Sequence, residues 1–464
     1  MQEASILVKT TSQMRKKFSV QINNKINKFN KKIKIPSDKS LSIRALLIAS
    51  QCIGISKIEN LLESEDVLNC LKILKKLGVK IIKNNKIYFV HGNGLNSFRS
   101  QKKITKIFVG NSGTTTRLLC GLLSTHEGKF YLYGDQSMNK RDMSRIIAPL
   151  EKIGCFFYPK KKYTLPLTIE GTTMPLAQKH IESKGSAQVK SSILLSALST
   201  PGTTTIEEKK ISRDHTEIFL NNISANIKVK KTLKGNIISL NGQKNLNAFY
   251  YTIGSDPSSA AFLIALTILT PGSKITIPRV ICNETRIKFI KILKKMNANI
   301  KIKNLKRDLN SGELIGSIIA SSSNLKPITV SKDIGTVIDE LPILFVIAGL
   351  TKGISKFNSI SELAHKESSR AVEMKKVLTQ AGIKCKTTNN SMKIFGSNKI
   401  KAKKKMILVK TKDDHRICMS SAILALATGI KTKIKNFQTV ETSFPKFLLT
   451  LKKIGANFEI IKKN

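Results

Sequence analysis

Arginine is rare in this chain and falls at positions suited to binding anions. The sequence has 80 Lys and Arg residues, of which only 12 are arginine. Seven of these lie in or beside the opening turn of a predicted helix: Arg44, Arg117, Arg141, Arg213, Arg286, Arg370 and Arg416. Arginine offers carboxylates and phosphates a planar bidentate fork, and helix N-termini carry unpaired N–H groups. We therefore expect several helix starts to converge on a cleft for small anions. Salt bridging to nearby acids is the alternative, above all for Arg213 and Arg286.

These helix starts belong to a pattern that occurs six times. In each unit an apolar helix is followed by a short strand, an amphipathic helix and a β-rich segment. Successive first helices begin about 70–83 residues apart, at Lys39, Asn111, Ser186, Asp256, Asp339 and Asp414. This period is too long for a solenoid repeat. It predicts an α/β (α+β) fold of compact βαβ-type units.

The chain length groups these units into two lobes of three. A chain of 464 residues exceeds the size at which a single core stops growing. The first helices are apolar nearly all round, which predicts that they lie inside the lobes, whereas the Lys-rich second helices should be more exposed. Four second helices are followed by β-like runs, at residues 225–230, 298–303, 383–388 and 456–462.

Composition excludes several classes of protein. The formal net charge is +50, but the lysines are spread along the whole chain, so no dedicated nucleic-acid site is expected. The longest apolar stretches are about ten residues, too short to span a membrane. The seven cysteines are scattered and never form a CxxC pair. They predict neither a zinc site nor a disulfide framework, and fit a reducing cytoplasm.

A series of motifs, in order, resembles one enzyme family. The motifs are IPSDKSLSIRALL, LLESEDV, VGNSGTTTRLL, GDQSMNKR, SAQVKSSILLSAL, SRDHTE, GSDPSSAAF, IDELPI, HKESSR, DDHR and TSFP. Together they resemble EPSP synthase (3-phosphoshikimate 1-carboxyvinyltransferase), in the bacterial branch that includes glyphosate-tolerant enzymes. The resemblance runs from about Lys31 to the C-terminus. Four residues depart from the family's usual pattern: Ser37 in place of Gly, Ile43 in place of a polar residue, Asp142 in place of Pro and Ser369 in place of Asp.

The resemblance implies a reaction and a fold. The family transfers the enolpyruvyl group of phosphoenolpyruvate to the 5-hydroxyl of shikimate 3-phosphate, with release of phosphate and without a metal or other cofactor. This step belongs to the synthesis of chorismate and aromatic amino acids. The fold is two lobes of three βαβαββ units. It implies a first lobe at residues 36–253 and a discontinuous second lobe at 254–464, to which a basic leader and first strand at 1–35 also belong.

The resemblance also implies a role for individual residues. Asp339 would be the base, Glu367 a proton-transfer group, and Lys39 a catalytic lysine between the two substrates. The predicted shikimate 3-phosphate ligands are Lys39, Ser40, Arg44, Ser186, Ala187, Gln188, Arg213, Asp339 and Lys366. The predicted phosphoenolpyruvate ligands are Lys39, Asn111, Gly113, Thr114, Arg141, Gln188, Arg370 and Arg416.

Several alternatives stay open at this point. Asp339 could simply cap the apolar helix that follows it. A sister enzyme, UDP-N-acetylglucosamine enolpyruvyl transferase, shares the architecture, as does a nucleic-acid-binding protein of related fold. The expected partners are the two small substrates alone, with a monomeric chain, no specific nucleic acid and no membrane. Residues 1–30 are expected to be a poorly ordered leader. Tolerant relatives carry Ala at the position of Gly113, so glyphosate is expected to inhibit this chain.

Overall fold

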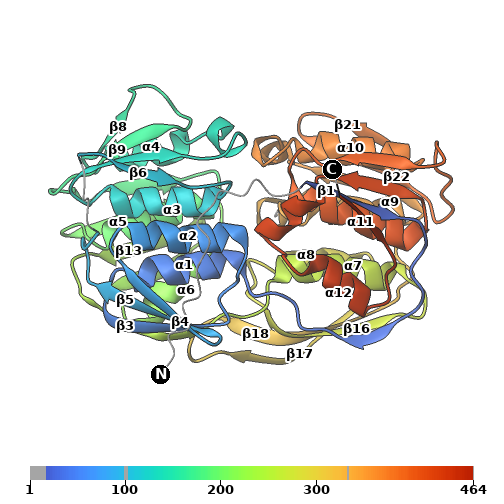
Figure 1. Cartoon of the computed structure of the whole chain (residues 1–464), viewed down its shortest axis with the longest axis horizontal. Coiled ribbons are helices and arrows are strands. Elements are labelled where there is room, and N and C mark those ends of the chain that lie inside the picture. Colours follow the sequence, from blue (N-terminus) through green and yellow to red (C-terminus); the bar gives the residue numbers. More distant parts are fainter. Residues whose placement is uncertain (1–16, 99–102, 332–333, 463–464) are drawn as a thin grey trace.

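The protein folds into two lobes that lie side by side (Figure 1). The computed structural model describes residues 17–98, 103–331 and 334–462. One hydrophobic core gathers side chains from residues 41–253, together with Ile281. The other gathers side chains from residues 20–35 and 260–456. No helix in these described ranges is long and apolar enough to cross a membrane.

The described residues form six sheets with one shared topology. In each, a parallel pair of strands is extended by two antiparallel ones. The first-lobe sheets are β14 (Leu246–Asn247), β3 (Cys52–Glu59), β5 (Ile87–Asn93) and β4 (Lys80–Asn84), with β15 (Tyr250–Thr252) beside β3; β6 (Thr105–Phe108), β7 (Lys129–Tyr133), β9 (Leu167–Glu170) and β8 (Phe156–Tyr158); and β10 (Lys179–Glu182), β11 (Thr203–Glu208), β13 (Gly235–Asn241) and β12 (Ile227–Thr232).

The second lobe repeats this arrangement, so the six βαβαββ units are confirmed. Its sheets are β2 (Asn30–Lys32), β16 (Lys274–Ile281), β18 (Leu314–Ser321) and β17 (Asn299–Arg307); β19 (Thr329–Val330), β20 (Gly353–Asn358), β22 (Ser391–Gly396) and β21 (Lys384–Thr387); and β23 (Ile407–Lys410), β24 (Thr432–Lys435), β1 (Phe18–Ile22) and β25 (Glu459–Lys462). Each of the four β-like runs predicted from sequence overlaps a strand of these sheets: β12, β17, β21 and β25.

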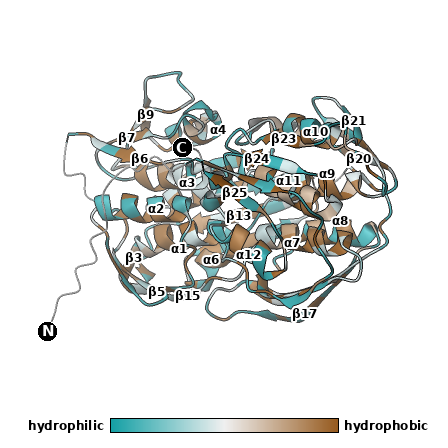
Figure 2. Cartoon of the chain, turned by 45° about the vertical axis from the view of Figure 1, so that its right-hand side comes forward, coloured by the Kyte–Doolittle hydropathy of each residue, from teal (hydrophilic) through white to brown (hydrophobic). Residues whose placement is uncertain are grey.

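The first helix of each unit lies inside its lobe, as predicted. These are α1 (Lys39–Ala49), α3 (Gly113–Leu123), α5 (Ala187–Ala197), α7 (Pro257–Leu269), α9 (Leu341–Gly349) and α11 (His415–Thr428). Every residue of α9 is buried, and hydrophobic colours dominate this helix in Figure 2. Helices that are apolar all round must be enclosed by other elements, which the sheets of each lobe do.

The second helices are amphipathic and cover the units. They are α2 (Glu65–Lys76), α4 (Ser144–Glu151), α6 (His215–Asn222), α8 (Lys288–Lys295), α10 (Arg370–Gln380) and α12 (Phe447–Lys453). In α8, Phe289, Ile290, Ile292 and Leu293 are buried, while lysines fill the last turn. Those lysines lie at the negative end of the helix dipole and face water.

The N-terminal segment corrects one expectation. Residues 1–30 were expected to form a poorly ordered leader, but β1 lies between β24 and β25, and Val20 and Ile22 are fully buried. Strand β2 pairs with β16. The part of the predicted leader at residues 1–16 lies outside the described residues.

Two chain segments pass between the lobes side by side. Asp38 N–H donates to the carbonyl of Gly254 at 2.9 Å, and Asp256 N–H donates to the carbonyl of Pro36 at 2.9 Å. Ser37, one of the departures from the family pattern, bridges to Ser255 in this pair. The two crossovers therefore bend together, and both lead directly into helix N-termini, at α1 and α7.

Candidate active site

A cavity of about 260 Å³ lies between the lobes, and we call it the interlobe cavity. All seven helix-start arginines line it, from both lobes. So does every residue predicted to bind shikimate 3-phosphate or phosphoenolpyruvate. Five of the six first helices begin with a side-chain cap: Asp38, Ser112, Ser186, Asp256 and Asp414 accept bonds from backbone N–H groups. The sequence therefore predicted correctly that helix starts converge on one basic cleft.

The start of α1 holds one corner of the cavity. The Lys39 ammonium pairs with the buried carboxylate of Asp66 at 2.8 Å, an interaction that the sequence motifs did not reveal. The Arg44 guanidinium is buried and donates to the hydroxyls of Ser40 (2.7 Å), Thr216 (2.8 Å) and Ser191 (3.0 Å), and to the backbone carbonyl of Ser40 at 3.2 Å. Burial lowers the pKa of Arg44 to about 10, so its charge persists at neutral pH.

A second corner is built around Gln188, at the start of α5. The Gln188 side chain accepts from Arg117 at 2.6 Å and donates to the hydroxyl of Thr114 at 3.0 Å. Arg117 was noted in the sequence only as a helix-start arginine. Burial, and then repulsion from Arg141, lower the pKa of Arg117 to about 10. A methyl group at Gly113 would lie 2.9 Å from Arg141 Nη1, so this position has no spare room.

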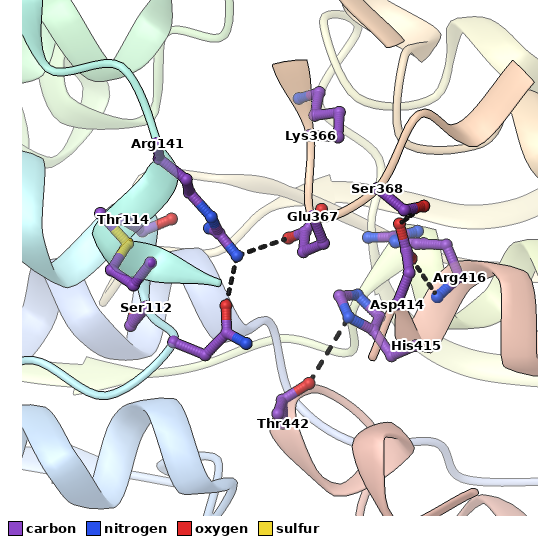
Figure 3. Close-up of polar contacts among 12 residues, drawn as sticks. Ser112, Thr114, Arg141, Lys366, Glu367, Ser368, Asp414, His415, Arg416 and Thr442 are labelled. Carbon is purple, nitrogen blue, oxygen red and sulfur yellow. Dashed lines mark hydrogen bonds and ion pairs between the residues drawn. The ribbon is translucent and has the colours of Figure 1, made fainter. Parts of the chain in front are cut away.

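Arg141 connects the first lobe to the second across the cavity (Figure 3). It donates to the side chain of Asn111, and its guanidinium lies 3.9 Å from the carboxylate of Glu367. The Arg141 Nε is buried and has no hydrogen-bond partner in the described part of the chain. A buried donor of this kind is costly unless a ligand satisfies it.

Asp339 stands among cations rather than at a helix cap. Its carboxylate lies 2.9 Å from Arg213, 3.3 Å from Arg370 and 3.5 Å from Lys366. Helix α9 begins at Leu341 with Glu340 at the cap position, so the interpretation of Asp339 as an N-cap is wrong. Burial raises the pKa of Asp339, but Lys366, Arg213, Arg416 and Arg370 together hold it well below its usual range.

Glu367 and Arg370 line the cavity beside Asp339. The Arg370 guanidinium is fully buried and bonds the carboxylates of Glu367 and, at 2.9 Å, Asp414. Asp414 also accepts from Ser368 at 3.0 Å, which supports Arg370 although Ser369 replaces the family's Asp. Burial opposes the ionised form of Glu367, but Arg370 and Arg141 outweigh it and hold the pKa well below its usual range.

Arg286 is buried and the Arg416 side chain is 11% exposed, and the two differ in how their charges are paired. Among the described residues, the Nε and Nη1 atoms of Arg416 have no hydrogen-bond partner, and its nearest carboxylate is that of Glu340 at 3.8 Å. Arg286 instead pairs with Asp38 and Asp256, each at 3.0 Å. The salt-bridge interpretation is therefore correct for Arg286, whose charge is already compensated.

Two further features were not expected from the sequence. Arg145 joins the lobes through Glu362, with contacts of 2.8 and 3.1 Å. Asp142, a departure from the family pattern, accepts from the backbone N–H of Ser144 at 2.8 Å and from its hydroxyl at 2.9 Å, at the first residue of α4. Its charge is directed at a helix start rather than left free beside the neighbouring arginine. In the part of the chain that the structure describes, no His, Cys, Asp and Glu side chains gather into a possible metal site.

Comparisons with known proteins agree with this architecture. Residues 23–451 match the family model described as EPSP synthase (3-phosphoshikimate 1-carboxyvinyltransferase). A 3-phosphoshikimate 1-carboxyvinyltransferase from Caldicellulosiruptor saccharolyticus is 39% identical over 425 residues, covering 90% of this chain and 95% of the relative. The corresponding protein from Ruthia magnifica is 38% identical, covering 92% of this chain and 96% of the relative.

Solved structures show the same similarity. EPSP synthase from Acinetobacter baumannii superposes with a TM-score of 0.81 at 33% identity, covering 96% of this chain and all of that one. The enolpyruvyl transferase NikO from Streptomyces tendae reaches 0.74 at 12% identity, covering 97% and 100%. The second comparison shows the shared fold alone.

Proposed function

Since the chain belongs to the EPSP synthase (3-phosphoshikimate 1-carboxyvinyltransferase) family, we propose how the residues of the interlobe cavity carry out that reaction. The chain is an enolpyruvyl transferase. It joins the enolpyruvyl group of phosphoenolpyruvate to the 5-hydroxyl of shikimate 3-phosphate and releases phosphate. Its relatives favour this activity over UDP-N-acetylglucosamine enolpyruvyl transfer.

The unsatisfied cations seat phosphoenolpyruvate. Among the described residues, Arg416 has two donors without a hydrogen bond and Arg141 has one, and both line the interlobe cavity together with Glu367 and Arg370. A phosphate and a carboxylate on one small molecule match two guanidinium groups held a short distance apart. Shikimate 3-phosphate then occupies the first-lobe corner, where the buried charge of Arg44 is bonded to three hydroxyls and one backbone carbonyl, and to no carboxylate of the described residues.

Asp339 accepts the proton of the 5-hydroxyl. The surrounding cations keep its carboxylate ionised at neutral pH, which a general base requires. A lowered pKa also makes it a weak base. Shikimate 3-phosphate brings negative charge to Arg213 and Lys366, which relieves their effect on Asp339 and strengthens the base when the substrate is present.

Glu367 supplies the proton that the phosphoenolpyruvate methylene gains. In the structure it is ionised, because Arg370 and Arg141 stabilise its charge. When the substrate's own anionic groups bind those arginines, the pKa of Glu367 rises and the group can carry a proton. Addition forms the C–O bond to shikimate 3-phosphate and converts the methylene to methyl. Elimination then breaks the C–O bond to phosphate while Glu367 takes a methyl proton back.

One observation carries this proposal: two carboxylates, Asp339 and Glu367, share the wall of a cavity with Arg141 and Arg416, whose donors are unsatisfied. The test is phosphate release by the purified chain with phosphoenolpyruvate and shikimate 3-phosphate, each omitted in turn. We expect release only when both are present. Release from phosphoenolpyruvate alone, or with UDP-N-acetylglucosamine in place of shikimate 3-phosphate, would contradict the assignment.

We also propose that a single chain is the working unit and that it bends at its paired crossovers, with lobes at residues 36–253 and 254–464. Both lobes of one chain supply cavity residues, and Arg213–Asp339 is one contact between them at 2.9 Å. Shikimate 3-phosphate should favour this closed arrangement by bridging the lobes. Small-angle scattering should then show a monomer whose radius of gyration decreases with this ligand.

A further inference from the structure

A second cavity, which we call the outer cavity, opens beside the interlobe cavity. It measures about 650 Å³ and is lined by residues of three segments, 135–142, 364–373 and 412–413. The first of these segments belongs to the first lobe. The other two segments belong to the second lobe. The outer cavity therefore lies where the two lobes meet.

The two cavities share part of their walls. Arg141, Asp142, Lys366 and Glu367 line both of them. Arg141 and Glu367 lie 3.9 Å apart across the shared wall, and their side chains are only 10% and 19% exposed. A small molecule in the outer cavity is thus directly beside the arginine and the glutamate that we assign to phosphoenolpyruvate.

The acidic groups of the outer cavity have partners within the protein. Asp135 and Asp142 accept backbone N–H bonds, from Met138 at 2.7 Å and Ser144 at 2.8 Å. In the remaining wall, Glu373 pairs with a lysine of its own helix, Lys376, at 2.8 Å.

The other two acids of this wall also have partners. Asp413 accepts from Asn436 at 3.1 Å, and Glu367 is bonded to Arg370. Carboxylates that are fully engaged in this way repel an incoming anion less than free ones do.

Two cations of the outer cavity are uncommitted. Arg141 and Lys366 are held by Glu367 and Asp339. Lys140 and Lys412 are exposed, and among the described residues their ammonium groups have neither an ion pair nor a hydrogen bond. Lys140 and Lys412 are therefore the cations of the outer cavity that are available to meet an incoming anion.

Lys412 is placed there by an unusual backbone. Lys412 and Asp413 have φ angles of 51° and 57°, two successive non-glycine residues in the left-handed region. A non-glycine residue in this region persists only where its surroundings enforce it. This turn leads into Asp414, which caps α11 and bonds Arg370. The same turn thus places a free lysine at the mouth and sets the start of the arginine-bearing helix.

We propose that the outer cavity is the port through which phosphoenolpyruvate reaches the interlobe cavity and inorganic phosphate leaves it, with Lys140 and Lys412 as steering residues. This proposal rests on the proposed function. The port gives a small dianion a route that ends at Arg141 while shikimate 3-phosphate fills the first-lobe corner. Steering acts on capture of the anion and not on the chemical step.

The test reverses both charges, in Lys140→Glu/Lys412→Glu. At an ionic strength of 0.01 M, where the Debye length is about 30 Å, we expect kcat/KM for phosphoenolpyruvate to fall roughly ten-fold. The loss should shrink when salt shortens that length to about 10 Å at 0.1 M. The inhibition constant of inorganic phosphate, competitive with phosphoenolpyruvate, should rise in parallel. The values of kcat and of KM for shikimate 3-phosphate should stay within about two-fold.

A matched control removes the contribution of net charge. Lys301→Glu/Lys303→Glu makes the same change on β17, an exposed edge far from the outer cavity (Figure 1). A charge-reversal effect no larger than in this control would overturn the port, as would an equal loss in kcat/KM for both substrates. The neutral pair Lys140→Gln/Lys412→Gln should give a smaller loss in the same direction, and serves if the reversal impairs folding. Because the unmodified chain is assayed alongside, its inactivity would instead refute the proposed function.

Discussion

Replacing Arg286 by Met should expose how the two crossovers are held together. Arg286 is 3% exposed and bonds Asp38 and Asp256, at 3.0 Å each, together with the hydroxyl of Ser258 at 3.1 Å. Asp38 and Asp256 cap α1 and α7, the helices that follow the crossovers. Without the guanidinium, two buried carboxylates remain with no cation between them.

The expected loss of stability is large. Removing one partner of a buried ion pair typically costs about 3–5 kcal/mol, because an uncompensated charge stays buried. We expect the free energy of unfolding to fall by about this amount at pH 7. Arg279→Met is the matched control: Arg279 pairs with Asp308 at 3.3 Å but its side chain is 45% exposed, so the cost should be at most about 1 kcal/mol.

The loss should depend on pH in one direction. Burial already raises the pKa of Asp256 with Arg286 present, and removing that cation raises it further. The folded variant then binds a proton that the unfolded chain, with its carboxyl pKa near 4, does not. The free energy of unfolding should therefore recover as pH falls from 7 to 5, by up to about 1.4 kcal/mol per pH unit relative to the unmodified chain.

Urea denaturation followed by circular dichroism at pH 7 and pH 5 measures both effects. The double variant Arg286→Met/Asp256→Asn keeps only one of the two carboxylates. It should be more stable at pH 7 than Arg286→Met and should depend less on pH. A loss below about 1 kcal/mol, a loss independent of pH, or no gain from Asp256→Asn would refute the reasoning.

Three further predictions concern the reaction. Asp339→Asn should abolish phosphate release while shikimate 3-phosphate still binds in calorimetry, because the amide cannot accept a proton; near-normal turnover would exclude Asp339 as the base. Arg416→Lys should raise the KM for phosphoenolpyruvate roughly ten-fold to a hundred-fold, the equivalent of a charged hydrogen bond, with little change in the urea midpoint. Arg370→Lys should raise KM and also lower that midpoint, since Arg370 bonds buried carboxylates; identical behaviour of the two variants would contradict this distinction. Gly113→Ala should raise the glyphosate inhibition constant more than the KM for phosphoenolpyruvate, although KM should also rise because the methyl would press on Arg141; equal increases would show that the methyl acts through that arginine alone.

Local pattern was sufficient to predict the repeating architecture. The apolar runs that become α7 and α9 identify enclosed helices, because a helix without a polar face cannot be stable on a surface. The six-fold spacing of such runs predicts six units whatever their contacts. Local pattern did not predict strand β1, because this strand is only five residues long and its partners, β24 and β25, lie more than 400 residues further along the chain.

The sequence also indicated where anions bind, through the rarity and placement of arginine, but it could not say which arginines are free. Arg286 and Arg416 both lie at helix starts, and only distances across the fold show that Arg286 is neutralised by Asp38 and Asp256. The sequence likewise could not show that the pKa of Asp339 is lowered, because the cations that lower it lie on other elements. Sequence determines residue type and local helix position, whereas electrostatic interaction depends on separations that only tertiary structure sets.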